Sequence, residues 1–256
     1  MSAVIRLGAM AAGVAAAVGI TLQPAGAMPA AHSAASPAAS AARARLVLHT
    51  GTPIPLRIVP SSSRIDHCWQ AAGRGVSLTF DDFGSPAQVK RIVAILDRNH
   101  VRGRFFPVGN WVRTHRSLVR YIKAHGHAVG NHTYDHPDLT RVSAAELRWE
   151  IRNGAKASGS PKLLRPPYGA GAFSARIRKA AAAQGLKVCF WTVDTRDWAG
   201  ASAGTIVRRV LHGDATTPPA RKDGVVLMHM FGAHTAVALQ PMIDGLRARD
   251  IKIESK

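Results

Sequence analysis

Two histidines spaced four residues apart, His132 and His136, are the first residues in this sequence that could do chemistry. Imidazole nitrogens at this spacing can bind one metal ion, but 12 histidines among 256 residues would give about half such a pair by chance. Pro137 disfavours helical geometry at His136, so we expect the pair on a turn that follows a strand. The alternative is two solvent-exposed histidines on a polar loop.

Two adjacent carboxylates, Asp81 and Asp82, could complete a metal site. The chain has only two cysteines, so a metal must be held mainly by histidines and carboxylates. Consecutive residues of a regular strand point to opposite faces, so both carboxylates serve one site only if the strand turns here, which Gly84 makes easy. One could then bind a metal while the other takes a proton from water. The alternative is that Asp82 caps the next helix.

His229 is a further titratable group, placed at the end of the apolar run 225–228. It could protonate a leaving group, although a single histidine after an apolar run is more often structural. Asp194 or Asp197 could orient this histidine and raise its pKa, and Trp198 could form the wall of an apolar pocket.

Short apolar runs alternate with helical patterns from about residue 68 onward. This alternation predicts a parallel sheet with helices outside it, either a barrel or a doubly wound sheet. The predicted strands are 75–80, 104–108, 128–130, 163–164, 187–193 and 225–228, and the predicted helices are 85–97, 117–125, 143 onward, 174–185, 202–211 and 236–249.

The candidate chemical groups share one position, which is the carboxyl end of a predicted strand. In a (β/α) barrel the loops that leave these ends meet at one rim, where the active site is built. The groups are Asp81 and Asp82, Asn131 and His132, the segment 165–169, Asp194 with Asp197, and His229. Polar residues scattered at random along the chain would not all fall at the carboxyl ends of strands.

The overall charge indicates an anionic partner. The formal net charge is +19, from 34 Lys and Arg against 15 Asp and Glu. Nucleic acid, anionic lipid and an anionic bacterial cell-wall polymer are all compatible with this charge. Nothing resembles a recognition helix or an aromatic-lined basic strand, so no nucleic acid partner is expected.

The N-terminal residues are typical of a secretory signal. Arg6 precedes the apolar run 7–22, and Ala25-Gly26-Ala27 offers the small residues that a signal peptidase needs. The run is shorter than the roughly 18 residues of a spanning helix, so no stable membrane span is expected after cleavage. An uncleaved anchor is the alternative. We therefore expect a protein that is secreted or associated with the cell wall.

Three regions are predicted along the chain. They are a signal peptide over 1–27, an Ala/Ser/Pro-rich linker and variable extension over 28–70, and a catalytic domain over 71–256. Export would permit a disulfide between Cys68 and Cys189, although two buried free thiols fit the sequence equally well.

The strand-end segments, taken in order, also carry a family resemblance. They read Thr79-Phe80-Asp81-Asp82, His132-Thr133-Tyr134-Asp135-His136, Arg165-Pro166-Pro167-Tyr168-Gly169, Asp194-Thr195-Arg196-Asp197-Trp198 and Leu227-Met228-His229. In this order they resemble the five motifs of the NodB-homology polysaccharide deacetylases, carbohydrate esterase family 4. The resemblance covers roughly residues 74–256, and five ordered motifs make it specific.

This resemblance implies a single catalytic domain with an α/β fold, a distorted (β/α) barrel of the polysaccharide deacetylase type. It implies metal-dependent removal of acetyl groups from amino sugars, or of acetyl esters from some polysaccharides. Matched residue by residue, Asp82, His132 and His136 resemble the ligands of Zn²⁺, with Co²⁺ or Mn²⁺ as alternatives.

The resemblance also implies how protons are transferred. Asp81 resembles the general base, and Arg165 resembles the residue that holds and tunes it. His229 resembles the general acid, and Asp197 is favoured over Asp194 as the carboxylate that sets its pKa. An amide nitrogen leaves poorly until it is protonated, so an acid opposite the base is required.

The remaining matched residues concern substrate binding. The backbone N–H of Tyr168 would stabilise the oxyanion, while Trp198 and Leu227 would line the pocket for the acetyl methyl group. The chain departs from the family at Met230, where many relatives have Asp, and at Arg104, where a small or hydroxyl residue is common. These departures leave the shape of the loops, and hence substrate preference, open.

The expected protein is therefore a secreted, monomeric hydrolase of carbon–nitrogen bonds that N-deacetylates N-acetylglucosamine units. Peptidoglycan is the first choice of substrate, chitin-type oligosaccharide the second and acetylxylan the third. The alternatives on this fold are an acetylxylan or other O-acetyl esterase and a hydrolase of another linear amide. A non-catalytic carbohydrate-binding relative would lack the base or a ligand, and here each of these positions is filled.

Overall fold

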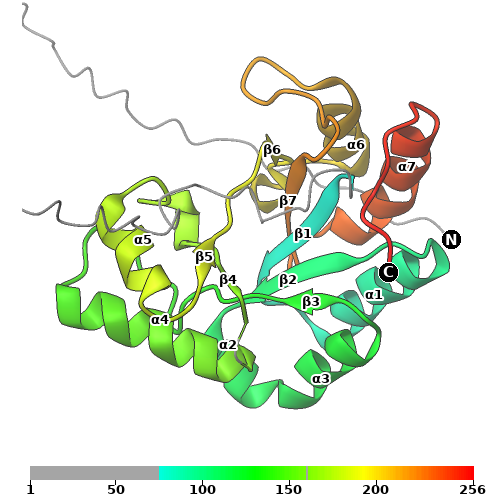
Figure 1. Ribbon diagram of the computed structural model, residues 1–256. Coiled ribbons are helices and arrows are strands. Elements are labelled where there is room, and N and C mark those ends of the chain that lie inside the picture. Colours follow the sequence, from blue (N-terminus) through cyan, green and yellow to red (C-terminus); the bar gives the residue numbers. More distant parts are fainter. Residues whose placement is uncertain (1–74, 160) are drawn as a thin grey trace, which may run out of the picture. The chain divides into compact units, whose positions relative to one another are not determined.

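A five-stranded parallel sheet forms the centre of the part that the computed structural model describes, residues 75–159 and 161–256 (Figure 1). Its strand order is β3-β2-β1-β7-β6, and a second parallel pair joins β4 to β5. The strands are β1 (Ser77–Asp82), β2 (Gly103–Pro107), β3 (Ala128–Val129), β4 (Leu163–Leu164), β5 (Lys187–Val188), β6 (Val193–Asp194) and β7 (Val225–His229).

The two sheets are connected at Asn131. This residue forms an isolated parallel bridge with Leu164, in which the backbone N–H of Asn131 donates to the oxygen of Leu163 at 2.9 Å. No pairing within the described residues joins β5 to β6, so the ring of strands is open there. The expected α/β fold, a parallel sheet of a distorted barrel with helices outside, is confirmed.

One predicted strand is wrong as a single element. The run 187–193 contains two short strands, because Lys187 and Val188 pair with β4 whereas Val193 pairs with Val226 of β7. The segment therefore leaves one sheet and enters the other, and a continuous strand cannot make both sets of hydrogen bonds.

Helices lie outside the strands, and three of the seven described α-helices begin at a capping serine. Ser85, Ser143 and Ser202 each accept a hydrogen bond from a backbone N–H three residues later. The helices are α1 (Pro86–Arg98), α2 (Gly109–Thr114), α3 (Arg116–Ala124), α4 (Ala144–Ser158), α5 (Ala175–Ala182), α6 (Ala203–His212) and α7 (Thr235–Arg247), with short 3-10 turns at Pro167–Gly169 and Asp197–Ala199. The short α2 was not predicted, and α5 ends before Gly185.

The core has two main parts. The larger part lies between the central sheet and α1, α6 and α7, and the smaller part lies beneath α4 and α5 on the β4-β5 side (Figure 1). All six residues of β1 are buried, including Ser77 and Thr79, whose hydroxyls donate to Glu254 and to the carbonyl oxygen of Val226. Burial of this strand on both faces fixes the position of its carboxyl end.

Arg104, one of the two departures from the family pattern, lies in a buried ion pair. It is 8% exposed and Glu254 is 1% exposed. Arg104 donates from Nη2 to Oε1 of Glu254 at 2.6 Å and from Nε to Oε2 at 3.0 Å, and the hydroxyl of Ser77 donates to Oε2 at 2.7 Å. Glu254 therefore compensates the charge that Arg104 brings into the fold.

The predicted signal peptide, the whole of the predicted linker and Cys68 lie outside the described residues, and the predictions for them stay predictions. In the part that is described, no helix combines the length and apolar character needed to cross a membrane.

Candidate active site

The adjacent carboxylates Asp81 and Asp82 both line one pocket at the carboxyl end of β1. They do so because the backbone turns at Asp82, whose φ of 71° lies in the left-handed region that Asp enters more readily than most residues. The strand therefore turns at the two aspartates, as both carboxylates facing one site requires. Gly84 permits a close approach, since a Cβ there would lie 2.7 Å from the carbonyl oxygen of Met230.

Asp82, His132 and His136 bring three potential metal ligands together. Oδ1 of Asp82 lies 3.0 Å from Nε2 of each histidine. This oxygen is buried, and no hydrogen-bond partner for it is found in the described part of the chain. A buried carboxylate oxygen beside two imidazole nitrogens is a donor set that suits a divalent cation such as zinc. Within the described ranges this is the one such cluster of His, Cys, Asp and Glu.

The ring of His132 is oriented by a hydrogen bond on the side away from Asp82. Nδ1 of His132 lies 2.8 Å from the carbonyl oxygen of Arg165, which leaves Nε2 facing Asp82. His136 has a φ of 64°, so it lies on a turn, as Pro137 predicted. Burial would raise the pKa of Asp82, but its contacts with the two imidazoles hold this pKa well below its ordinary value.

Arg165 holds Asp81 from inside the barrel. It is fully buried and donates from Nη1 to Oδ1 of Asp81 at 2.7 Å and to the hydroxyl of Thr79 at 2.8 Å. Its guanidinium lies 4.3 Å from the centre of the Phe106 ring. Oδ2 of Asp81 lies 3.8 Å from Nε2 of His132, so this second oxygen faces the candidate metal ligands.

Asp197 holds His229 on the other side of the pocket. Nδ1 of His229 lies 2.8 Å from Oδ1 of Asp197, while the backbone N–H of His229 donates to Oδ2 at 2.7 Å. Burial lowers the pKa of His229, but the hydrogen bond and charge of Asp197, together with the charges of Asp81 and Asp82, raise this pKa overall. Asp194 lies on the pocket wall, where its carboxylate accepts from the backbone N–H of Arg196.

Three residues that support Asp197 were missed by the sequence analysis. Thr235 donates to Oδ2 at 2.5 Å and Thr195 donates to Oδ1 at 3.2 Å. A Cβ on Gly232 would lie 2.6 Å from Oδ2, so only glycine leaves room for the carboxylate. Thr195 precedes Asp197 in the same motif and could have been found, whereas Thr235 is 38 residues away.

Glu150 on α4 was also missed, although it holds the loop between His132 and His136 in place. Oε2 of Glu150 accepts from the backbone N–H groups of Tyr134 at 2.8 Å and Asp135 at 3.0 Å. Burial raises the pKa of this carboxyl above its ordinary value. No local sequence pattern links a helix residue to a loop that precedes it.

The pocket has a volume of about 470 Å³. Tyr168 and Trp198 are 71% and 54% exposed at its edge, while Leu227 is buried in its wall. Of the ten predicted site residues, eight line this pocket. The other two, Arg165 and Asp197, lie behind Asp81 and His229. Trp191 and Phe231 also line the pocket but were not among the predicted residues.

This arrangement can hydrolyse an acyl compound. A carboxylate and an imidazole, each held by its own buried partner, flank a cluster of metal-ligand atoms and an open pocket. Asp81 and His229 are register partners on neighbouring strands, so both side chains reach the same end of the sheet. One group can accept a proton while the other donates one.

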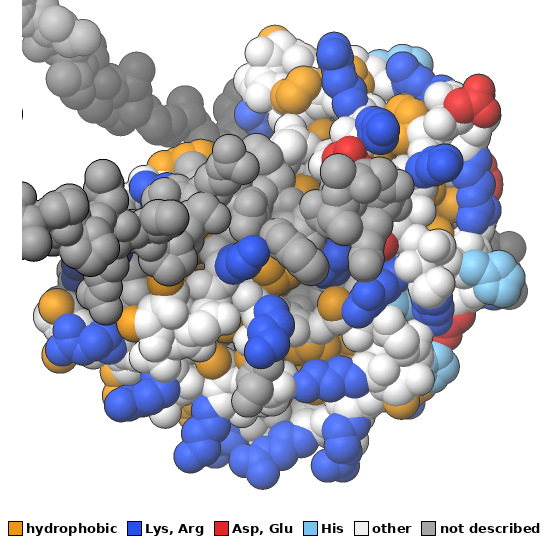
Figure 2. Space-filling view, viewed as in Figure 1, with side chains coloured by type: hydrophobic (Ala, Val, Ile, Leu, Met, Phe, Trp, Pro, Cys, Tyr) orange, Lys and Arg blue, Asp and Glu red, His pale blue; other side chains and the backbone are white. Residues whose placement is uncertain are grey.

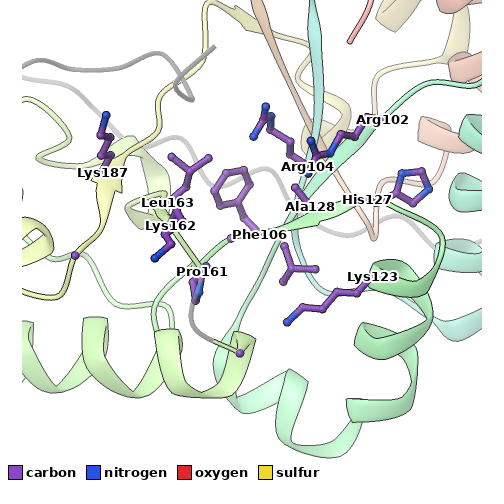
Figure 3. Close-up of a pocket in the computed structure, with 14 residues that line it drawn as sticks. Arg102, Arg104, Phe106, Lys123, His127, Ala128, Pro161, Lys162, Leu163 and Lys187 are labelled. Atoms are coloured by element: carbon purple, nitrogen blue, oxygen red, sulfur yellow. The ribbon is translucent and has the colours of Figure 1, made fainter. Parts of the chain in front are cut away.

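A second cavity, of about 600 Å³, lies at the amino ends of β2 to β5 (Figure 3). Its lining includes five cationic side chains and no acidic one within the described residues: Arg102, Arg104, Lys123, Lys162 and Lys187. Figure 2 shows Lys and Arg side chains spread over this face of the molecule. Positive charge therefore gathers away from the pocket that Asp81 and Asp82 line.

Comparisons with known proteins are consistent with this geometry. The family described as polysaccharide deacetylase matches residues 70–189. A chitooligosaccharide deacetylase of Bradyrhizobium is 35% identical over 162 residues, which are 61% of this chain and 70% of that protein. The peptidoglycan-N-acetylglucosamine deacetylase PgdA of Listeria monocytogenes is 33% identical over 200 residues, 75% of this chain. The chain spans only 40% of the length of that relative.

Solved structures agree with the sequence comparisons. A family 4 carbohydrate esterase from Streptomyces lividans, in complex with acetate, has a TM-score of 0.62 and 33% identity, covering 70% of this chain and 91% of that chain. A family 4 pseudoenzyme from Bacillus anthracis has a TM-score of 0.63 and 28% identity, covering 70% of this chain and 62% of that chain.

Proposed function

The chain belongs to the polysaccharide deacetylase family, carbohydrate esterase family 4, and on this premise we propose that it removes N-acetyl groups from N-acetylglucosamine units of peptidoglycan or chitin-type glycans. The observation that carries the proposal is the pairing of Asp81 with Arg165 and of His229 with Asp197 on two sides of one pocket. Such paired groups provide a base and an acid for hydrolysis of an amide.

Asp82, His132 and His136 are the residues that would hold a divalent cation, which we take to be Zn²⁺, with Co²⁺ or Mn²⁺ as alternatives. Once bound there, such a cation would act as a Lewis acid on the acetyl carbonyl and on the attacking water. The orphaned Oδ1 of Asp82 supports this assignment.

Asp81 serves as the general base in this proposal. It takes a proton from the water whose oxygen attacks the acetyl carbon. Arg165 fixes Oδ1 of Asp81, so Oδ2 is the oxygen directed at the pocket. The backbone N–H of Tyr168 would donate a hydrogen bond to the negative oxygen that develops on the former carbonyl, and would so stabilise it.

His229 serves as the general acid. When the carbon–nitrogen bond breaks, the nitrogen takes a proton from the imidazolium, and the products are acetate and a free amine. Asp197 holds the ring and favours its protonated form. Leu227 and Trp198 would surround the acetyl methyl group, because both line the pocket with apolar surface.

Acetate release tests this function. A zinc-loaded preparation is expected to release acetate from peptidoglycan or from N-acetylglucosamine oligomers, and to lose this activity on complete chelation. Acetylxylan is assayed in parallel. Faster release from acetylxylan would favour the O-acetyl esterase alternative, and release that survives chelation would contradict the proposed chemistry.

Export of the protein is a separate part of the proposal. The relatives that act on peptidoglycan and the composition of residues 1–27 support a location outside the cytoplasmic membrane or at the cell wall. We take 71–256 as the catalytic domain and the protein as a monomer. Fractionation of expressing cells, N-terminal sequencing of the exported chain and sedimentation would test these three points.

A further inference from the structure

Two exposed phenylalanines, Phe83 and Phe231, stand at the edge of the candidate active site. They lie on the loops that leave the neighbouring strands β1 and β7. Phe83 is 51% exposed and Phe231 is 39% exposed. Their ring centroids are 5.4 Å apart and their planes meet at 29°, so the rings stack on each other in solvent. Exposed aromatic surface beside a concave site is characteristic of ligand binding.

The pair continues the wall of the pocket. Phe231 lines the pocket itself, and its ring centroid lies 5.2 Å from that of His229. Phe83 follows Asp82 directly in the chain and stacks on Phe231. The two rings therefore run from the candidate proton donor to the surface next to the pocket.

Contacts between the two loops fix this pair in place. Nε2 of Gln88 donates to the carbonyl oxygen of Gly232 at 2.9 Å. Met230 is fully buried, and its backbone N–H donates to the carbonyl oxygen of Asp81 at 3.0 Å. Gly84 lets the loops approach closely. Because the rings are held before a ligand arrives, binding to them costs little conformational entropy.

We propose that Phe83 and Phe231 form a subsite for the sugar ring next to the unit that is deacetylated. The inference rests on the proposed function and adds a requirement for linked sugars. A pyranose with equatorial substituents presents axial C–H groups on both faces. These groups pack favourably on the electron-rich face of an aromatic ring. A chain of at least two such units would reach both the pocket and the pair.

The test compares substrates of different length. Wild type and the double variant Phe83→Ala/Phe231→Ala are assayed with an N-acetylglucosamine pentamer and with p-nitrophenyl acetate, which reaches only the acetyl pocket. For the pentamer the double variant is expected to raise KM by about 10-fold, as the loss of two aromatic contacts implies. For p-nitrophenyl acetate, Phe83→Ala alone should keep the kcat/KM of wild type, because Phe83 does not line the pocket. An unchanged KM for the pentamer overturns the inference.

Conservative variants distinguish stacking of the sugar on an aromatic ring from simple contact with an apolar side chain. Phe231→Trp should keep the pentamer KM of wild type, whereas Phe231→Leu should raise it, because leucine covers the loop without an aromatic face. Wild-type KM in Phe231→Leu would overturn the inference. Val237→Ala serves as the control, since Val237 is 47% exposed on α7 and does not line the pocket.

Binding distinguishes failure of the subsite from failure of the proposed function. If wild type releases no acetate from any glycan, the proposed function is wrong. Pentamer binding followed by the fluorescence of Trp191 and Trp198 then tests the subsite by itself. Weaker binding in the double variant supports the subsite. Equal binding in the two proteins, or no binding to wild type, overturns it.

Discussion

His229 and Asp197 share two contacts, one through the imidazole ring and one through the main chain. Nδ1 lies 2.8 Å from Oδ1 of the carboxylate, and the backbone N–H donates to Oδ2 at 2.7 Å. Asp197 therefore fixes the position of the candidate acid as well as its ring. Its negative charge also makes the protonated imidazole more stable, which suits a group that must give up a proton near neutral pH.

Asp197→Asn should move the alkaline limb of the pH–kcat profile to lower pH. The acid acts only when protonated, and the folded protein raises the pKa of His229. Activity is thus present below this pKa and is lost as pH rises through it. Without the carboxylate the pKa falls, so the loss begins at lower pH. The measurement is kcat for acetate release across the pH range.

The matched control for that profile is Asp194→Asn. Asp194 lines the pocket but accepts from the backbone of Arg196, and no contact with His229 is found for it among the described residues. Its variant should keep the alkaline limb of wild type. If Asp194→Asn moves the limb and Asp197→Asn does not, the assignment of the two carboxylates is reversed.

Asp81→Asn should lower kcat by about 10² to 10⁴, the usual contribution of a positioned base. Bound metal should stay near wild-type stoichiometry, because Asp82, His132 and His136 remain in place. The measurements are acetate release and metal content of the purified variant. A variant that retains wild-type kcat would remove Asp81 from the role of base.

His132→Ala should abolish stoichiometric zinc binding, since it removes one of three converging ligand atoms. Equilibrium dialysis against zinc, followed by metal analysis, gives the readout without reference to activity. His125→Ala is the control, because His125 pairs with Asp97 outside the pocket. Equal zinc content in both variants would contradict the ligand assignment.

Glu254→Gln should lower the free energy of unfolding by about 3 to 5 kcal/mol, because Arg104 then stays buried without its counter-charge. Replacing both residues by Met should restore part of this loss. Urea denaturation followed by circular dichroism gives the values. A double variant as unstable as the single one would show that the uncompensated charge is not the cause.

Adsorption to anionic cell-wall polymer should weaken as salt is raised, because screened attraction between charges weakens with ionic strength. Lys162→Glu with Lys187→Glu should weaken it further, since both side chains line the cationic cavity. The bound fraction is measured by cosedimentation with purified cell walls at several salt concentrations. Adsorption independent of salt would exclude this role for the charge.

Much of the site could be predicted because its residues follow strands. Asp81 and His229 each end an apolar run, and parallel strands carry such residues to one rim. The succession of strands along the chain and most helix starts depended on local patterns, such as the serine before α1. These patterns are short-range, so one sequence is enough to read them.

Contacts between distant residues could not be predicted in this way. Thr235 reaches Asp197 across 38 residues, and Glu254 reaches Arg104 across 150. The division of 187–193 between two sheets also depends on partners elsewhere in the chain. In each case tertiary packing decides the outcome, and the local sequence carries no sign of it.

The left-handed backbone at Asp82 restricts how this lineage can change. Alanine and branched residues are strained at a φ of 71°, whereas asparagine adopts it readily. Asp82→Asn is therefore a single substitution that removes the negative charge with which Asp82 would bind a cation, and it disturbs the loops around it little. A descendant could lose hydrolysis in one mutational step and still hold a glycan, which gives binding proteins without activity a short evolutionary path from this fold.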